Sequence, residues 1–155
     1  MFKLDGFPPI SEERRNKLFQ VRPGPVFDLL GMRLDEVEAG HSRLSLPFKE
    51  SLTHSGGFVQ GGIITALADA AVAFAIWTAM DDTHQDQTSI DIKMNFIRPG
   101  SGDLWAEGWI VHLGSRTAVG ESMVYNQANK PVAKCLSSVM LVEKAYMATH
   151  KPDGA

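Results

Sequence analysis

Residues 61–80 read GGIITALADAAVAFAIWTAM, a stretch that is apolar except for Thr65, Asp69 and Thr78. Its length of about 20 residues would fit a membrane span. The Asp69 carboxylate would then lie near the bilayer centre, at a cost of about 2.5–3.5 kcal/mol, and the stretch ends in Asp81-Asp82 without a basic flank. A helix that is apolar on every side is otherwise enclosed by protein. We therefore predict a fully buried core helix and no membrane span.

Segments with the pattern of β-strands lie on both sides of this helix in the sequence. The predicted strands are residues 32–39, 41–48, 89–97, 104–113, 116–126 and 132–143, with residues 81–88 predicted as a loop. In the third strand one face is expected to carry Ile90, Ile92, Met94 and Phe96, and the other Ser89, Asp91, Lys93 and Asn95. Short turns rich in Gly, Pro and Asn suit antiparallel neighbours.

About six strands can enclose a single helix only if their sheet curls around it. The fold class is therefore α+β, with a curved antiparallel sheet wrapped around one long central helix. A chain of 155 residues is long enough for one such domain. We place the domain at residues 31–145, after a helical N-terminal extension at residues 1–30 in which Ser11 caps the first helix, and Gly31 closes the second. Residues 146–155 are predicted to be a flexible tail.

Composition excludes several classes of protein. The formal net charge of -3 and the scattered Lys and Arg residues give no basic surface for nucleic acid. The single cysteine, Cys135, cannot form an internal disulfide and has apolar neighbours, and the first residues lack the apolar run of a signal peptide. We expect a buried core thiol in a cytoplasmic protein. The histidines show no metal-ligand spacing and no Gly-x-Ser-x-Gly elbow occurs, so no metal site is predicted and a serine hydrolase is disfavoured.

The start of the long helix is a candidate site because of Gly61 and Gly62. Glycines let a ligand approach the backbone closely, and the first N–H groups of a helix have no partner within it. The helix dipole also favours negative charge there, which suits a polarised carbonyl or an oxyanion. The alternative is that the two glycines only allow the helix to pack tightly on the sheet.

Asp69 is the second candidate, because an ionised carboxylate in an apolar helix is costly unless it is paired or functional. Thr65 lies one turn earlier and could hydrogen-bond it, and alanines nearby leave open space around it. Asp69 is then either a general base or nucleophile, or a structural acid held by strand hydroxyls or backbone N–H groups. Gly61 and Asp69 are about 12 Å apart along the helix. If both act on one small carbonyl, they must come from two subunits, so the spacing predicts a homodimer with a composite site.

Four further residues are weaker candidates. His54 and Gln60 flank the glycine-rich loop, where each could orient a carbonyl or a water, or simply bond to the loop backbone. Arg98 and Arg116 stand at strand ends, where they could reach phosphates, although exposed arginines often make no such contact.

Residues 54–69, HSGGFVQGGIITALAD, resemble the active-site segment of hot-dog-fold thioesterases of the phenylacetate-pathway (PaaI-like) type. In that family a polar residue and a glycine loop precede a helix-opening Gly-Gly, and an acid follows eight residues after the first of these glycines. Residues 89–99, SIDIKMNFIRP, resemble the strand after the helix, and residues 114–118, GSRTA, resemble the following hairpin. The resemblance extends from about residue 24 to residue 143 and implies a hot-dog fold.

The resemblance implies hydrolysis of an acyl-CoA thioester to a free acid and CoA, with no cofactor other than the CoA of the substrate. The Gly61 N–H would polarise the thioester carbonyl, Asp69 of the partner subunit would act as nucleophile or general base, and Ser89 would orient the attacking water. The residues implied in binding the substrate or its CoA part are Gly62, Thr65, Arg98, Pro99, Ser115 and Arg116. Family members are commonly dimers or dimers of dimers.

Two positions depart from the family pattern. His54 stands where an amide is usual, and Gln60 stands where a histidine is usual, although both side chains can still donate hydrogen bonds. The departures motivate an alternative, a non-catalytic acyl-CoA-binding hot-dog domain. A hot-dog hydratase ranks last, because no Asp-x-x-x-x-His spacing follows the helix. Aryl and medium-chain acyl groups both stay open, since the candidate pocket aromatics also suit the core: Phe58, Phe74, Trp77 and Trp105.

Overall fold

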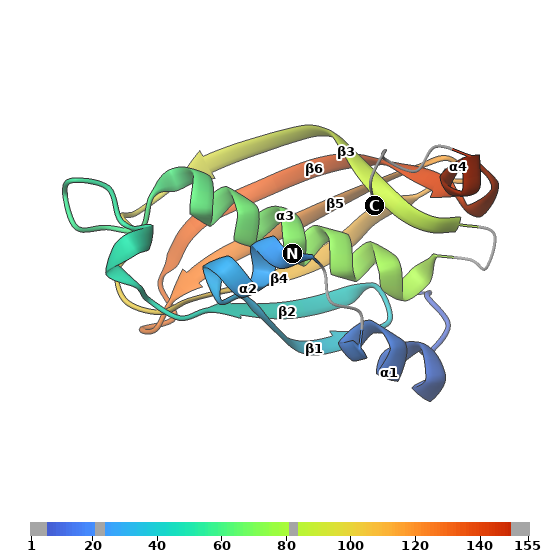
Figure 1. Ribbon diagram of the computed structural model, residues 1–155, viewed down its shortest axis with the longest axis horizontal. Coiled ribbons are helices and arrows are strands. Elements are labelled where there is room, and N and C mark those ends of the chain that lie inside the picture. The colour runs from blue at the N-terminus through green and yellow to red at the C-terminus, as the bar shows by residue number, and fades with distance from the viewer. Residues whose placement is uncertain (1–5, 21–23, 81–83, 150–155) are drawn as a thin grey trace.

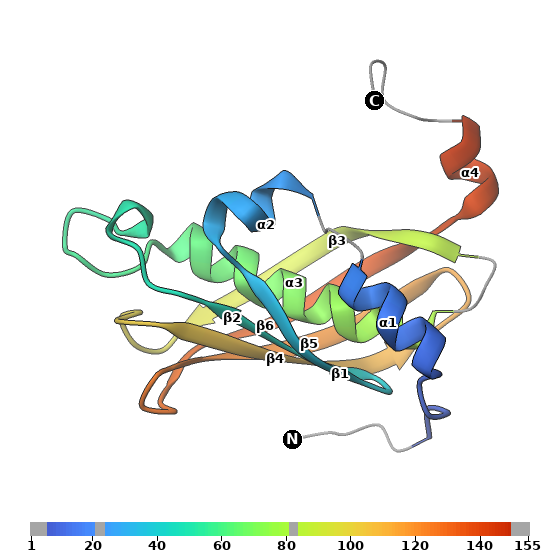
Figure 2. The same ribbon diagram turned by 60° about the horizontal axis from the view of Figure 1, so that its bottom comes forward.

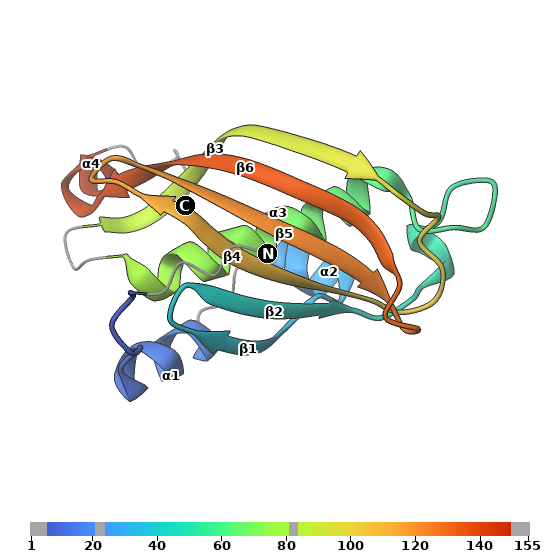
Figure 3. The ribbon, with the colours of Figure 1, turned by 180° about the vertical axis from the view of Figure 1, so that it is seen from behind.

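The computed structural model describes residues 6–20, 24–80 and 84–149. Its elements in chain order are α1 (Glu12–Gln20), α2 (Pro25–Leu30), β1 (Arg33–Glu38), β2 (His41–Leu46), η1 (Glu50–Leu52), α3 (Gly61–Ala79), β3 (His84–Phe96), β4 (Leu104–Leu113), β5 (Thr117–Asn126), β6 (Pro131–Glu143) and α4 (Lys144–Thr149). The strands form one antiparallel sheet in the order β1-β2-β4-β5-β6-β3. Figure 1 shows α3 lying along one face of this curved sheet, and Figure 3 shows the other face without a covering helix in the described part of the chain. The predicted α+β architecture is confirmed.

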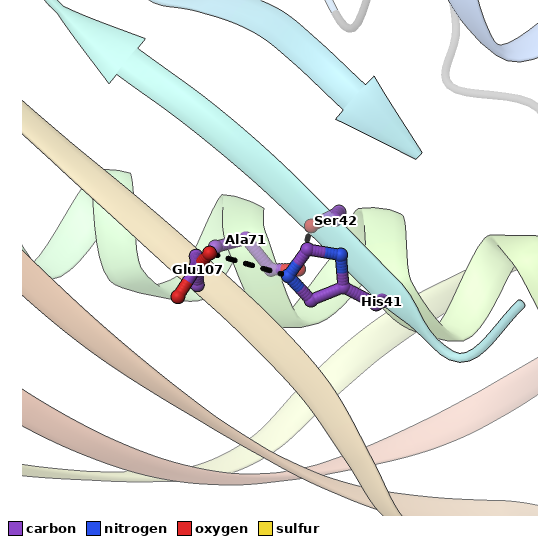
Figure 4. A network of polar contacts seen from close by, with 4 residues as sticks. All are labelled: His41, Ser42, Ala71 and Glu107. Atoms are coloured by element: carbon purple, nitrogen blue, oxygen red, sulfur yellow. Dashed lines mark hydrogen bonds and ion pairs between the residues drawn. The ribbon is translucent and has the colours of Figure 1, made fainter. Parts of the chain in front are cut away.

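Close packing fixes how α3 sits on the sheet. A Cβ on Gly108 of β4 would overlap the backbone carbonyl of Ala71, so only glycine lets the helix approach this strand so closely. The Ser42 hydroxyl of β2 donates to the Ala71 carbonyl at 2.7 Å (Figure 4), and the Ser122 hydroxyl of β5 donates to the Ala68 carbonyl at 2.8 Å. These contacts set the rotation of α3, and with it the side of the helix that faces β3.

The prediction of a fully buried helix is only partly right. Just over half of α3 is buried, and it is the one helix in residues 6–20, 24–80 and 84–149 that is long and apolar enough to cross a membrane. Its buried side includes Leu67, Ala71 and Phe74, which pack in the core. A less buried stripe follows the helical repeat through Thr65, Asp69 and Ala73. The carboxylate therefore lies on the part of α3 that this single chain leaves partly open.

In the N-terminal extension, α2 packs on α3 from the side away from the sheet (Figure 2), and α1 lies beside β1 at the edge of the sheet (Figure 1). The Phe27 ring of α2 lies 6.0 Å from the Phe74 ring of α3, centroid to centroid. Ser11 accepts a hydrogen bond from the Arg14 N–H, and Gly31 ends α2 with a φ of 78°, in the left-handed region that favours glycine. Both predicted caps are confirmed.

One prediction about an irregular segment is wrong. Residues 84–88, predicted as part of a loop, belong to β3, which pairs with β6 from His84 onward because backbone hydrogen bonds form there despite the polar side chains. The first residues of the predicted tail lie in α4, which spans Lys144–Thr149, and the flexibility of the tail stays a prediction. The loop residues 81–83 and the tail residues 150–155 lie outside the described part.

The predicted alternation along β3 is also wrong at its start. A bulge separates Ser89 from Asp91 in the pairing with β6. Ser89 pairs with Val139 and Ile92 pairs with Ser137, two buried residues on the α3 side of the sheet. The bulge therefore places Ser89 on the same face as Ile92, where the simple period of two would put it on the opposite face.

Candidate active site

Asp69 and Ser89 form a hydrogen-bonded pair between α3 and β3. The Ser89 hydroxyl donates to Asp69 Oδ1 at 2.9 Å. Burial raises the pKa of the Asp69 carboxyl above its ordinary value, and the hydrogen bond from Ser89 acts in the opposite direction by favouring the carboxylate. The predicted bond from Thr65 is wrong, because the Thr65 hydroxyl donates to the Gly61 carbonyl at 2.9 Å. A partly buried carboxyl with a raised pKa and one orienting donor has the properties of a general base.

The first turn of α3 presents one free N–H group. Gln60 caps the helix, and its Oε1 accepts hydrogen bonds from the N–H groups of Gly62 at 2.6 Å and Ile63 at 3.2 Å. The Gly61 N–H has no hydrogen-bond partner in the described part of the chain. Of the two predicted glycines, only Gly61 is therefore available to polarise a carbonyl.

An aromatic ring that sequence reasoning did not assign to the site lies beside Gly61. A Cβ on Gly61 would lie 3.3 Å from the ring of Phe96, at the end of β3. Phe96 is 55% exposed, so the ring borders an open space next to the Gly61 N–H. The sequence pattern identified Phe96 only as a strand residue, because the contact joins two elements that lie 35 positions apart in the chain.

His54 is oriented by its own loop. Its Nδ1 accepts a hydrogen bond from the Gly56 N–H at 2.9 Å, and its ring centroid lies 6.0 Å from that of Phe58. In the neutral imidazole the proton is then on Nε2, which can donate to a carbonyl or a water. The side-chain oxygen of Gln60, by contrast, accepts a hydrogen bond that caps the helix. His54 and Gln60, which are exchanged relative to the family pattern, therefore have different roles. Gln60 caps the helix, and His54 can donate a hydrogen bond.

The residues predicted for CoA binding divide into two groups. Arg98 and Pro99 follow the end of β3, and Arg98 Nη1 donates to the Pro131 carbonyl at 2.7 Å. Ser115 and Arg116 lie in the turn before β5, where the Arg116 carbonyl accepts from the Leu141 N–H. Because β5 runs between these two ends of the sheet, one chain does not bring all four residues to one phosphate.

Cys135 and Gln87 also lie near the part of α3 that holds Asp69, and the sequence did not predict either position. Burial raises the pKa of the Cys135 thiol to about 11, with a lowering contribution from a Ser122 hydrogen bond and a raising contribution from the Asp69 charge. Cys135 is thus the buried core residue that was predicted, and the charge of Asp69 contributes to the rise in its pKa. Gln87 Nε2 donates to the Ala73 carbonyl at 2.7 Å. Alternation along residues 132–143 places Cys135 inward but cannot name the helix residue above it.

No group of three metal-ligating side chains occurs within residues 6–20, 24–80 and 84–149. The four described histidines lie apart, on the loop before α3, at the start of β3, on β2 and near the end of β4. The chemistry that the described residues offer is therefore that of a carboxylate, a hydroxyl and a backbone N–H.

Comparison with known proteins relates this arrangement to a family. The family model of the thioesterase superfamily matches residues 56–133, which include Gly61, Asp69 and Ser89. A protein of Saccharolobus solfataricus assigned as an esterase is 29% identical over 144 residues, covering 92% of this chain and 93% of the relative.

Solved structures agree with the fold. A thioesterase family protein from Silicibacter pomeroyi superposes with a TM-score of 0.76 at 22% identity, covering 84% of this chain and 97% of that one. The E. coli PaaI protein from the phenylacetic acid degradation operon superposes with a TM-score of 0.74 at 21% identity, covering 83% and 95%. The segment matched by the family model, residues 56–133, spans α3 and the strands that hold the candidate site. The chain therefore belongs to the thioesterase superfamily and is a thioester hydrolase with the hot-dog fold.

Proposed function

We propose that the protein is an acyl-CoA thioesterase whose site combines Asp69 and Ser89 of one chain with Gly61 of a second copy. The observation that carries this proposal is the free Gly61 N–H at the start of the same helix that holds the Asp69–Ser89 pair. Eight residues of helix separate Gly61 from Asp69 by about 12 Å, too far for both to act on one carbonyl within a chain. In a dimer, Gly61 of one chain and Asp69 of the other can act on the same carbonyl.

The reaction follows from these groups. The thioester carbonyl accepts a hydrogen bond from the Gly61 N–H, which stabilises the negative charge that develops on oxygen. Asp69 removes a proton from a water, the resulting hydroxide forms a bond to the carbonyl carbon, and the C–S bond breaks to release the CoA thiolate, which takes up a proton. Direct attack by the Asp69 carboxylate, followed by hydrolysis of the anhydride, is the nucleophilic variant. Ser89 holds the carboxylate in either case.

The free edge of β3 supplies the surface for the second copy. Large apolar side chains are exposed along or just after this strand: Ile90, Ile92, Phe96 and Ile97. If two β3 strands pair antiparallel about Ile92 and Lys93, Phe96 lies opposite the partner's Ser89. Gly61, which contacts Phe96, then approaches the partner's Asp69. The same twofold axis brings Arg98 toward the partner's Arg116, which would reunite the two groups of CoA-binding candidates. A dimer of dimers is compatible with this pairing.

We propose an aryl- or medium-chain acyl group as substrate. Phe96 beside the Gly61 N–H, and Phe58 beside His54, offer apolar ring surface next to the carbonyl position. No cofactor beyond the CoA of the substrate enters the proposal. We assign the activity to the cytoplasm, in keeping with a single buried thiol.

The first experiment is free-thiol release from phenylacetyl-, hydroxybenzoyl-, hexanoyl- and palmitoyl-CoA, with wild type compared with Asp69→Asn. Turnover that collapses in the variant supports the proposal, and full turnover in Asp69→Asn contradicts the assigned mechanism. Tight acyl-CoA binding by a folded wild type without thiol release would favour the second candidate, the binding domain. That candidate is motivated by Gln60, whose oxygen is committed to the helix cap where the family usually has a histidine.

Gly61→Pro tests the N–H group with little change elsewhere. Gly61 is the first helical residue, where proline is well tolerated, and Gln60 before it is already extended with φ -66° and ψ 139°. The substitution deletes the N–H and is expected to lower kcat by about 100-fold. Gly61→Ala, which keeps the N–H and adds one methyl near the exposed Phe96 ring, is the matched control and should retain most activity.

A mixed dimer tests whether the site is shared. Asp69→Asn and Gly61→Pro chains are co-expressed with different affinity tags, so that mixed dimers can be purified. If each active site is shared between the chains, one of the two active sites in a mixed dimer contains both native Asp69 and native Gly61. Mixed dimers should then recover about half of the wild-type activity. Activity no greater than that of the two parent variants would show that each chain works alone.

A further inference from the structure

One buried hydroxyl under α3 has no hydrogen-bond partner. The buried hydroxyl residues among those described are Ser42, Thr78, Ser122 and Ser137. The first three donate to carbonyl oxygens of α3, those of Ala71, Ala75 and Ala68 respectively. The Ser137 Oγ of β6, in a residue of 0% exposure, has no such bond. Desolvation without a partner opposes folding, so a hydroxyl kept in this state calls for a functional reason.

The strand register relates Ser137 to Asp69 through its two neighbours on the same face of β6. Two residues before it on the same face of β6 is Cys135, which pairs with Ser122 of β5, the donor to the carbonyl of Ala68, the residue before Asp69. Two residues after it is Val139, which pairs with Ser89, the donor to Asp69 Oδ1. Asp69 and its neighbour Ala68 thus bind partners of the two residues that flank Ser137, and Ser137 is the inward-facing residue between them.

We propose that Ser137 is a positioning residue for Asp69, its hydroxyl turning to donate to Oδ2, the carboxylate oxygen that Ser89 does not hold. Oδ2 has no hydrogen bond in the described part of the chain, and a serine hydroxyl changes partner by rotation about its Cα–Cβ bond. Donors on both oxygens fix the plane of the carboxylate and favour its ionised form. This inference rests on the proposed function, in which Asp69 acts as a carboxylate.

Few charges face Asp69. It is the only charged residue of α3. On β3, Asp91 and Lys93 pair with Ser138 and Leu136, which lie on the opposite face of the sheet from Ser137. On β6 the titratable neighbour is Cys135, whose pKa of about 11 keeps it neutral at working pH. The ionisation of Asp69 therefore reports chiefly its hydrogen-bond donors and its burial.

The test compares Ser137→Ala with wild type in the pH dependence of kcat/KM. Loss of a donor raises the pKa of Asp69, so the acid limb should move up by about half a unit, which is about a threefold loss of rate on that limb. The rate at pH 8 should stay within about twofold of wild type. Ser137→Thr, which returns the hydroxyl, should restore the wild-type limb. The matched control is Thr78→Val, which removes a buried hydroxyl that binds a helix carbonyl near the other end of α3, and it should leave the limb in place while lowering the melting temperature.

A titration of the Asp69 side-chain carboxyl by carbon-13 NMR separates this inference from the proposed function, because it needs no turnover. A higher pKa in Ser137→Ala than in wild type supports the positioning role even if none of the four thioesters is hydrolysed. An unchanged pKa in a folded Ser137→Ala protein, or an equal rise in Thr78→Val, overturns it even if hydrolysis is brisk.

Discussion

The two edges of the sheet differ in length, charge and exposed apolar surface. The β1 edge is six residues long, and its exposed side chains are the charged ones of Arg33, Asp35, Glu36 and Glu38. The β3 edge is thirteen residues long and exposes Ile90 at 61%, and Phe96 at 55%. Charges and short length protect a strand edge from pairing, whereas a long edge with apolar side chains invites it. The difference teaches that the β1 edge is built to face water and that the β3 edge is suited to a second copy.

The catalytic candidates lie toward the β3 edge. Ser89 and Phe96 belong to β3 itself, and Asp69 and Gly61 contact them from α3. The β1 edge carries no residue of the predicted site. Substitutions at the two edges should therefore differ in their effects on activity and on oligomeric state.

The largest effect is expected from removing the carboxylate near β3. Asp69→Asn should lower kcat by about 10³-fold, because the amide cannot accept a proton from water or form the acyl intermediate, while its oxygen can still accept from Ser89. Initial-rate thiol release under saturating substrate measures this. A loss of less than tenfold would mean that the β3 side does not hold the chemistry.

The second prediction breaks the β3 edge itself. Ile90→Glu places a charge on the exposed apolar side chain of this strand and should shift the protein from dimer to monomer, with a loss of kcat/KM of about 100-fold from misplaced groups. Analytical ultracentrifugation and thiol release provide the two readings. Leu29→Glu is the matched control, since Leu29 is 75% exposed and belongs to α2, which packs on α3 through Phe27 and forms no part of the sheet edge, and it should leave both unchanged. A dimer that persists in Ile90→Glu with full activity would refute the role of this edge.

The third prediction concerns the donor on β3. Ser89→Ala removes the hydrogen bond that favours the Asp69 carboxylate, so kcat should fall by about tenfold and the acid limb of kcat/KM should move to higher pH. A full pH profile distinguishes this shift from a uniform loss of rate. An acid limb at the wild-type position would assign Ser89 to water orientation alone.

Asp69→Asn should also stabilise the fold, which is a smaller effect. The folded-state pKa of Asp69 lies above its ordinary value, so its contribution to stability is fully present below the unfolded-state pKa and is lost as pH rises through the folded-state pKa. At neutral pH the buried carboxylate therefore opposes folding, and the amide should raise the free energy of unfolding by about 1 kcal/mol. The gain should shrink at acidic pH. Thermal unfolding at pH 7 and pH 4 checks the sign, and a lower melting temperature at pH 7 would contradict it.

The smallest effect is expected at the β1 edge. Glu36→Ala removes an exposed charge beside the register shift between Leu34 and Glu36, and it should change the free energy of unfolding by less than about 0.5 kcal/mol. Dimerisation and kcat/KM should match wild type. A change in oligomeric state here would mean that the two edges share the interface.

The sequence alone determined the architecture and singled out two candidate groups, Gly61 and Asp69. An apolar run of helical length must be enclosed, and alternating segments can enclose it only as a curved sheet, so residues 61–79 and their strands followed from local pattern. The helical rise alone also separated Gly61 from Asp69 and so pointed to two subunits. The limits of residues 84–88 and 144–149 were missed, because backbone pairing and capping there do not depend on apolar periodicity.

Only the tertiary structure decided which side chains meet. A bulge in β3 turns Ser89 toward Asp69. The Gln60 side-chain oxygen accepts the Gly62 N–H, and the Gly61 N–H stays free. Phe96 and Cys135, from strands distant in the sequence, lie beside the candidate site. The physical reason is that such contacts depend on strand register and helix rotation. Close approach at Gly108 and the hydroxyl bonds under α3 set that rotation, and none of these long-range contacts leaves a mark in the local pattern of residues.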